Sequence, residues 1–206
     1  NSEYSLGFTQ LVFVAGMCNN AKFDETDMET PVRQRKCNGD ATDTALLKFN
    51  AEFNRIDNID KKYEILADIP FNSKNKWMVK IIRPNDEQTH QKIFGNDYDL
   101  DSDVILLKGA PDYLLKKSTH IIEENGTEVL LKNEVINEII KIQNEWCILG
   151  QRVLLMCKKR CDYDDVMNLT PNVPLEEYIH RSNDFCVVGL CGIIDPPREG
   201  ISDVVK

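Results

Sequence analysis

The stretch VILLKGAPDYLL at residues 104–115 indicates how this chain folds. Its first four residues form a short run of β-branched and apolar side chains, which is typical of a strand. Pro111 and Asp112 then suit the first turn of a helix, where a missing amide proton is harmless and a negative charge is favourable. The stretch therefore predicts a strand that passes directly into a helix, with Lys108 and Gly109 at the junction.

Other segments extend this pattern into a fold class. Short β-branched and apolar runs predict three further strands, at 77–82, 153–157 and 185–194. Apolar residues at three- and four-residue steps predict helices that begin near Phe8, after a capping Asp40, and near Val135, the last ending at Gly150. Strands and helices do not alternate in a βαβ rhythm, and no GxGxxG follows a strand. The predicted fold class is α+β, with a largely antiparallel twisted sheet flanked by helices.

Two segments lack a clear period. Residues 23–38 are acidic and then basic, with Pro31 inside, and we expect a long surface loop. Residues 84–103 are rich in acidic side chains and turn signals, so we expect a hairpin excursion or a mobile loop. The three histidines stand in polar or loop contexts, which predicts surface positions for all of them: His90, His120 and His180.

Composition restricts the possible partners. The 206 residues can form one domain or two small ones, and the net charge of -9 argues against nucleic-acid binding, which relies on basic surface. No run of about 18 apolar residues exists, so we expect no direct contact with a membrane. The seven cysteines include no CxxC pair, which predicts reduced, mostly buried thiols, a cytosolic setting and no structural metal site.

Three residues far apart in the sequence are candidates for binding a phosphorylated, flat ligand. Phe71 lies in a polar, turn-rich stretch, and an exposed ring there can stack on a base, an interaction worth about 1–3 kcal/mol. Lys108 is expected to point its ammonium into a cleft beside Gly109, which lets a ligand approach the backbone. Arg152 begins a strand, and its guanidinium can donate two parallel hydrogen bonds to phosphate or ribose oxygens.

Each candidate also has a structural explanation. Phe71 could pack in a hairpin, Lys108 could be a solvated lysine at a turn, and Arg152 could form a surface salt bridge. Thr42 and Asp43 begin the helix after Asp40, where a carboxylate could accept a hydrogen bond from the amino group of a base. Ordinary helix capping explains these two residues almost as well.

Five motifs in a fixed order strengthen the ligand-binding interpretation: GDATDTALLK (39–48), PFNSKNKW (70–77), KGAPDYLL (108–115), GQRVL (150–154) and DPPRE (195–199). Together they resemble the nucleotide-binding domain of a P-type cation-transporting ATPase, and they are most similar to the sodium/potassium and proton/potassium pump branch. KGAP and DPPR are the most specific of these motifs. The resemblance covers the whole chain.

The resemblance implies an ATP site and assigns no catalytic residue or metal ligand to this chain. Phe71 would stack on adenine, Lys108 would lie deep in the pocket, and Arg152 would contact ribose and phosphate. Asp43 matches an acidic position near the adenine amino group. The full set of ATP-binding residues implied by the resemblance is Thr42, Asp43, Phe71, Lys76, Lys108, Gly109, Ala110, Arg152 and Leu154.

The resemblance also implies a domain organisation. Residues 1–194 would form the nucleotide-binding domain, and 195–206 would contain the hinge and the start of the return to a phosphorylation domain. The hinge residues would be Asp195, Pro196, Pro197 and Arg198, in which two prolines fix the direction of the chain. The family's DKTGT, GDGxND and TGE motifs are absent. We therefore expect a cytoplasmic domain of an integral membrane protein, whose phosphorylation and actuator domains are its partners.

The expected function is to hold ATP while its γ-phosphate is transferred, with Mg²⁺, to an aspartate outside this chain. This transfer would drive cation transport in the parent protein. The chain alone should bind ATP weakly, at roughly 0.1 mM to several mM. Two alternatives remain: a non-catalytic interaction module that uses the acidic segments 23–38 and 84–103, and a free-standing hydrolase that uses scattered acidic residues.

Overall fold

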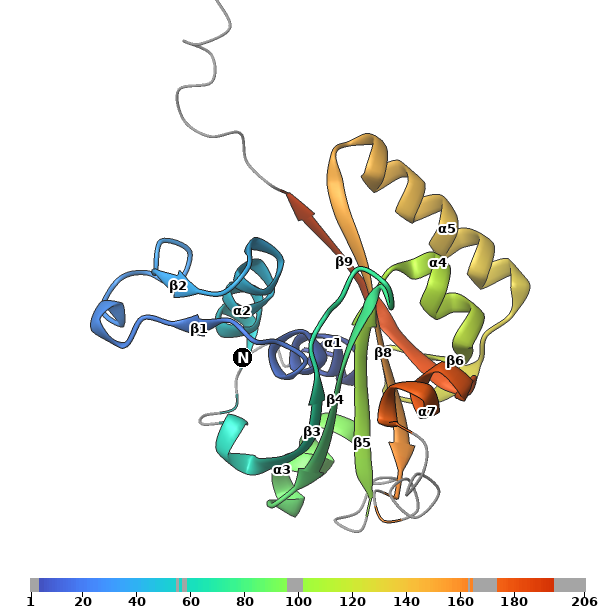
Figure 1. Cartoon of the computed structure of the whole chain (residues 1–206), viewed down its shortest axis with the longest axis horizontal. Helices are drawn as coiled ribbons and strands as arrows, with labels where there is room; N and C mark the ends of the chain where they lie inside the picture. The colour runs from blue at the N-terminus through green and yellow to red at the C-terminus, as the bar shows by residue number, and fades with distance from the viewer. Residues whose placement is uncertain are drawn as a thin grey trace, which may run out of the picture.

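A mixed sheet of seven strands forms the centre of the protein (Figure 1). The computed structural model describes residues 4–54, 56, 59–95, 102–162, 164 and 174–194. The strands, in their order across the sheet, are β3 (Tyr63–Ile69), β4 (Trp77–Pro84), β5 (Asp103–Gly109), β8 (Gln151–Cys161), β9 (Phe185–Ile194), β6 (Ser118–Ile122) and β7 (Glu128–Leu130). Within the described chain, β6 and β9 are the one parallel pair of this sheet. The predicted fold class, α+β with a largely antiparallel sheet, is confirmed.

Helices cover both faces of this sheet (Figure 1). One face is covered by α1 (Leu6–Met17), α2 (Ala41–Phe53) and α3 (Glu87–Phe94). The other is covered by α4 (Pro111–Leu114), the 3-10 turn η3 (Leu115–Lys117), α5 (Asn133–Ile148) and α7 (Leu175–Arg181). Another 3-10 turn, η2 (Ile59–Lys62), precedes β3.

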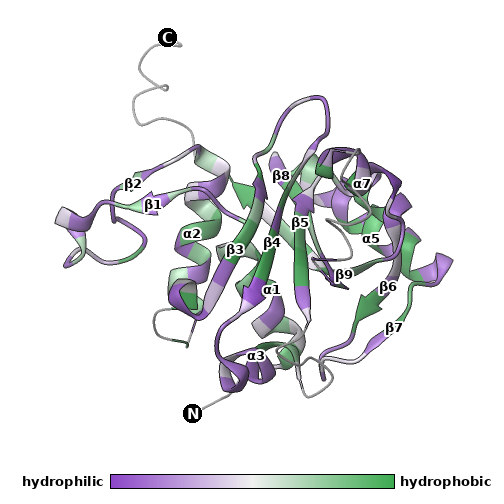
Figure 2. Ribbon diagram, turned by 60° about the horizontal axis from the view of Figure 1, so that its bottom comes forward, coloured by the Kyte–Doolittle hydropathy of each residue, from purple (hydrophilic) through white to green (hydrophobic). Residues whose placement is uncertain are grey.

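The two faces have separate apolar cores because side chains alternate along each strand. In β5, Leu106 packs with the α1–α2 core, whereas Leu107 packs with the α5–α7 core. Both residues are completely buried, as expected for a strand with helices on either side. The central strands are accordingly the most hydrophobic part of the ribbon (Figure 2).

Local signals explain the boundaries of the predicted helices. The Asp40 carboxylate accepts from the backbone N–H of Asp43 at 2.9 Å, which caps α2 as predicted. The α5 helix gives way to a turn in which Gly150 has φ of 76°, a left-handed conformation that glycine adopts without steric cost. The prediction for β9 matches its observed bounds, and the other three predicted strands are longer than their apolar runs.

The prediction of a long loop at 23–38 is wrong at both ends of that segment. Strands β1 (Lys22–Phe23) and β2 (Cys37–Asn38) pair antiparallel, and the 3-10 turn η1 (Glu25–Asp27) follows β1. The guanidinium of Arg35 donates to the carbonyl of Met28 at 2.8 Å and lies 4.9 Å from the centre of the Phe23 ring. Polar and cation–π contacts order this arm, so the hydrophobic pattern gave no signal. The arm extends away from the sheet beside α2 (Figure 2).

The prediction for 84–103 is also corrected, because part of this segment forms α3. The Asp86 carboxylate caps the helix by accepting from the N–H of Thr89 at 2.8 Å. Ile93 and Phe94 are buried against the α1–α2 core. His90, predicted at the surface, is fully buried, and its Nδ1 lies 3.1 Å from the hydroxyl of Tyr63. Residues 96–101 lie outside the described part.

No helix in the described part of the chain has the length and hydrophobicity needed to cross a bilayer. All seven cysteines are described, and all are free thiols. The prediction of mostly buried thiols holds for six of them, since three are buried, three are half-buried and Cys147 alone is exposed.

Candidate functional site

The segments that carry the candidate residues meet at one end of the sheet. β4 begins at Trp77, β5 ends at Gly109, and these two residues are paired across the strands. Gly109 is also paired with Leu155 in β8, one residue beyond Leu154. The hairpin before β4, the junction after β5 and the start of β8 therefore lie side by side (Figure 1).

Close backbone packing explains the glycine in the KGAP motif. A Cβ on Gly109 would lie 2.4 Å from the carbonyl oxygen of Lys76 and 2.9 Å from the Cα of Trp77. The next residue, Ala110, donates its N–H to that same oxygen at 3.0 Å. The sequence suggested that Gly109 admits a ligand, but here the missing side chain makes room for the neighbouring strand. This contact joins KGAP to the hairpin that carries Phe71.

Lys108 is buried and paired with an acidic residue of α2. Its side chain lies on the face of the sheet covered by α1 and α2, and Lys108 and Asp43 are only 3% and 6% exposed. Their ammonium and carboxylate groups form an ion pair. The second carboxylate oxygen of Asp43 accepts from the N–H of Asn20 at 2.9 Å. The ammonium of Lys108 thus faces the first turn of α2 and not an open cleft as predicted.

Arg152 contacts the same turn of α2. Its Nη1 donates to the hydroxyl of Thr42, which lies next to Asp43 in the chain. Asp40 supplies the helix cap. The side chains of Thr42 and Asp43 are therefore not needed for capping, and they contact Arg152 and Lys108 instead. Ordinary capping therefore does not explain the side-chain contacts of these two residues. We call Arg152, Thr42, Asp43 and Lys108 the α2 cluster, because their two pairs meet at adjacent residues of one helical turn.

Phe71 and Lys76 lie on the hairpin between β3 and β4, at the same end of the sheet. Phe71 is 53% exposed, which leaves its ring accessible for stacking, and Lys76 is also exposed. Lys76 has φ of 65°, an uncommon conformation for a residue with a side chain. The side-chain oxygen of Asn72 accepts from the N–H of Asn75 at 2.8 Å, and the backbone carbonyl of Asn72 accepts from the N–H of Lys76 at 3.0 Å.

A second buried lysine adjoins the α2 cluster, and sequence reasoning missed it. Lys80 donates to the carbonyl of Asn19 at 2.6 Å and lies 3.5 Å from the carboxylate of Asp68. The side-chain amide of Asn19 in turn donates to the carbonyl of Asp43 at 2.9 Å. A lysine inside the apolar run at 77–82 was the available signal, because a charge in a central strand needs a buried partner.

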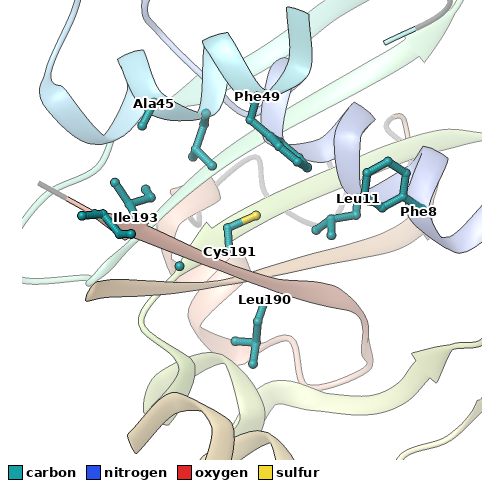
Figure 3. A pocket seen from close by; sticks show the side chains of 10 residues that line it. Phe8, Leu11, Ala45, Phe49, Leu190, Cys191 and Ile193 are labelled. Atoms are coloured by element: carbon teal, nitrogen blue, oxygen red, sulfur yellow. The ribbon is translucent and has the colours of Figure 1, made fainter. Parts of the chain in front are cut away.

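An apolar cavity of about 450 Å³ lies farther along α2, between α1, α2 and the end of β9 (Figure 3). In Figure 3, Leu11, Phe49 and Cys191 surround this space, whereas Leu190 points to the other side of β9. Its lining residues are Phe8, Leu11, Ala45, Leu46, Phe49, Leu190, Cys191, Gly192, Ile193 and Ile194. Because none of them is charged, the cavity does not suit a triphosphate.

Two other sequence expectations concern the hinge and metal ligands. The hinge residues Asp195, Pro196, Pro197 and Arg198 lie outside the described part, as does all of 195–206. Among the described residues, no three His, Cys, Asp or Glu side chains are grouped so that they could hold a metal ion.

Comparisons with known proteins give one family and several similar proteins. Residues 7–200 match the family described as P-type ATPase, cytoplasmic domain N. The sodium/potassium-transporting ATPase subunit alpha of Hydra vulgaris is 32% identical over 203 residues, which cover 98% of this chain and 18% of the relative. The subunit alpha-4 of Homo sapiens is 32% identical over 199 residues, 95% of this chain and 18% of the relative.

A potassium pump subunit gives the same result. The potassium-transporting ATPase alpha chain 2 of Oryctolagus cuniculus is 32% identical over 199 residues, which cover 96% of this chain and 17% of the relative. The chain therefore spans less than a fifth of the length of the relatives that it matches.

Proposed function

The chain belongs to the family of cytoplasmic N domains of P-type ATPases, and from this premise we propose that it binds ATP for a cation pump of which it is one domain. The observation that carries the proposal is the α2 cluster. It brings a lysine and an arginine from two strands to the first turn of one helix, beside a hairpin with an exposed aromatic ring. In a chain with a net charge of -9, Arg152, and Lys108 once it is released from Asp43, supply the local positive charge that a triphosphate needs.

The proposed contacts follow from the chemistry of each residue. Phe71 stacks on the adenine ring, and Arg152 donates hydrogen bonds to ribose or phosphate oxygens. Lys108 contacts the nucleotide deep in the site, and Asp43 accepts from the adenine amino group. Lys76, Gly109, Ala110, Thr42 and Leu154 complete the proposed site.

The Lys108–Asp43 ion pair bears on the affinity. Since both side chains are almost inaccessible to water, ATP reaches them only if α2 and β5 separate slightly or the side chains move. This rearrangement reduces the net binding free energy, because a ligand pays for any change of conformation that it requires. We therefore propose weak binding by the chain alone, at roughly 0.1 mM to several mM.

The activity of the whole pump is the wider proposal. Residues 1–194 bind ATP, and 195–206 contain the hinge that returns to a phosphorylation domain. Domain closure then presents the γ-phosphate to an aspartate of that domain, and Mg²⁺ would accompany the triphosphate and offset its negative charge. We place the chain in the cytoplasm, as a domain of an integral membrane protein that also contains an actuator domain.

Calorimetric titration of the 206-residue chain with ATP tests the proposal. Phe71→Ala should weaken binding about tenfold, because it removes base stacking. Arg152→Lys keeps the charge and loses the parallel pair of donors, so it should weaken binding less. Tyr4→Ala is the matched aromatic control, since Tyr4 is also exposed and lies outside the proposed site. An ATP affinity that is equal in the wild type and in Phe71→Ala contradicts the proposed site, and no binding by the wild type contradicts the proposed function.

A further inference from the structure

The hairpin that carries Phe71 is attached by hydrogen bonds to α7, which lies on the face of the sheet opposite α2. Asn75, near the end of this hairpin, is completely buried. Its side-chain nitrogen donates to the carboxylate of Glu176, and its side-chain oxygen lies 3.2 Å from Nε2 of His180. Both partners belong to α7, which is separated from Asn75 by about a hundred residues of sequence.

The hydrogen-bond partners of His180 determine which ring nitrogen carries the proton. Glu176 accepts from the nitrogen of the Asn75 amide, so the amide oxygen faces His180 and Nε2 carries the proton. In the neutral ring Nδ1 is then an acceptor, and the hydroxyl of Tyr113 donates to it at 2.7 Å. The ring of His180 also lies edge-on to Trp77, the first residue of β4, with 5.5 Å between the ring centres. We call Asn75, Glu176, His180 and Tyr113 the hairpin clamp.

Core packing and hydrogen bonds hold α7, which carries two residues of this clamp, in place. Ile179 is completely buried in the α5–α7 core. The ammonium of Lys117 donates to the carbonyls of Ile179 at 3.3 Å, of Ser182 at 3.2 Å and of His180. A cation at these last carbonyls satisfies acceptors that the helix leaves unpaired and interacts favourably with its dipole.

The hairpin itself has a conformation that needs support. Lys76 has φ of 65°, and a residue with a side chain keeps such a conformation only where its surroundings impose it. Asn75 immediately precedes Lys76, and Phe71 lies four residues before Asn75. A side chain fixed at Asn75 therefore restricts the backbone on which both proposed ATP contacts stand.

We propose that Asn75 is a positioning residue, which acts with Glu176 and His180 to hold the hairpin so that Phe71 and Lys76 face the nucleotide. The inference rests on the proposed function, because it concerns affinity for ATP. The physical basis is preorganisation: a hairpin already ordered loses little conformational entropy on binding. Without the clamp, the same contacts form at a greater entropic cost, and the affinity falls although no ATP-contacting residue has changed.

The Asn75→Asp variant tests this role in the 206-residue chain. It keeps the size of the side chain and the oxygen that accepts from His180, but it places a carboxylate against that of Glu176. We expect the ATP dissociation constant to rise about fivefold, the equivalent of one lost hydrogen bond. Adding Glu176→Gln restores a donor opposite the new carboxylate and should return the constant to near its wild-type value. Glu177→Gln is the control, because Glu177 lies on the same helix and pairs with Arg181 at the surface.

The readout separates positioning from stability. Chemical-shift titration gives the ATP affinity and the amide shifts of residues 71–76, and thermal unfolding of the same samples gives the stability. A purely structural role lowers the unfolding midpoint and leaves the affinity of the folded protein unchanged, and that result overturns the proposal. Failure of Glu176→Gln to restore affinity also overturns it. If Asn75→Asp does not fold, His180→Ala at the exposed end of the clamp should give the same loss of affinity.

Failure of the hairpin clamp can be distinguished from failure of the proposed function. If the wild type binds no ATP, the proposed function fails while the clamp is still tested by hydrogen exchange. Amides of 71–76 should exchange faster in Asn75→Asp and recover with Glu176→Gln. Unchanged exchange in Asn75→Asp contradicts the clamp itself.

Discussion

The two faces of the central sheet differ in what their strands bury. On the α1–α2 face, Lys80, Lys108 and Lys158 are almost inaccessible to water. On the α5–α7 face, the same strands bury apolar side chains such as Trp77 and Leu107. Because side chains alternate, a single strand such as β4 contributes to both faces. Both faces have an apolar core, and the α1–α2 face, which we call the charged face, buries Lys80, Lys108 and Lys158 in addition.

Each buried lysine on the α1–α2 face has an acidic partner. Lys80 pairs with Asp68 at 3.5 Å, Lys158 pairs with Glu128 at 2.8 Å, and Lys108 pairs with an aspartate of α2. The desolvation of two charges offsets most of their attraction, so such pairs add little net stability. Under the proposed function, one of these pairs, Lys108 with Asp43, has a role in ATP binding beyond its small contribution to stability.

The largest expected effect comes from breaking one of these pairs. Asp43→Leu leaves the ammonium of Lys108 buried without its partner, which should lower the free energy of unfolding by about 3–5 kcal/mol. Denaturant unfolding of the chain measures this change. The double variant Asp43→Leu with Lys108→Met is the control. It should recover most of the stability but none of the ATP affinity, and a double variant that binds ATP normally contradicts a binding role for this face.

A core substitution on the other face should lower stability without changing ATP affinity. Leu107→Ala removes a completely buried side chain next to Lys108 in the chain, and the loss of packing should cost about 3 kcal/mol of stability. The ATP affinity of the protein that remains folded should be unchanged, because Leu107 faces away from α2. Denaturant unfolding and calorimetry on the same samples measure both quantities. A large loss of affinity would show that the two faces are not separable.

Thiol reactivity tests how well both faces exclude water. Burial raises the pKa of Cys18, in the α1–α2 core, to about 11 and that of Cys157, in the α5–α7 core, to about 12. Both thiols should stay protonated and unreactive at neutral pH, since the thiolate is the nucleophile. Mass spectrometry after brief alkylation should find Cys147, the exposed thiol, labelled first. Early labelling of Cys18 would mean that the charged face opens to water.

The smallest effect concerns the cap of α3 at the edge of the charged face. Hydrogen bonds from Thr89, with a further one from Lys62, lower the pKa of Asp86 to about 2. A lowered pKa stabilises the fold above the ordinary value of about 3.9, and this stabilisation is lost as pH falls toward 2. Amides of α3 should therefore exchange faster at pH 2 than at pH 5, relative to the rest of the chain. Asp86→Asn keeps a capping oxygen without a titrating group, so α3 should lose this extra dependence on pH.

The sequence predicted those elements whose stability comes from regular apolar patterns. It did not predict β3, where polar and apolar residues are mixed in an edge strand, or the short β6 and β7. It also missed α7, whose seven residues are too few for a helical period to be visible. The capped α3 was hidden among acidic residues that suggested a loop.

The candidate site was predictable as a set of motifs but not as a geometry. Sequence patterns predicted Lys108 and Arg152 at strand ends. In the structure, Lys108 forms an ion pair with Asp43 of α2, and Arg152 donates a hydrogen bond to Thr42 of the same helix. The pairing of Lys108 with Asp43 spans 65 positions, and local sequence could not choose that aspartate among its acidic neighbours. Lys80 and the contacts of Asn75 were missed for the same reason, since only the folded chain supplies their partners.

The proposed function requires an adenine nucleotide to bind beside the α2 cluster, at the hairpin end of the sheet. Backbone chemical-shift mapping of the 206-residue chain during titration with ATP locates this site. The largest shifts should fall on 42–43, 71–76, 108–110 and 152–154, with few changes on α5. Shifts confined to the apolar cavity around Phe49, or no shifts at millimolar ATP, would contradict this prediction.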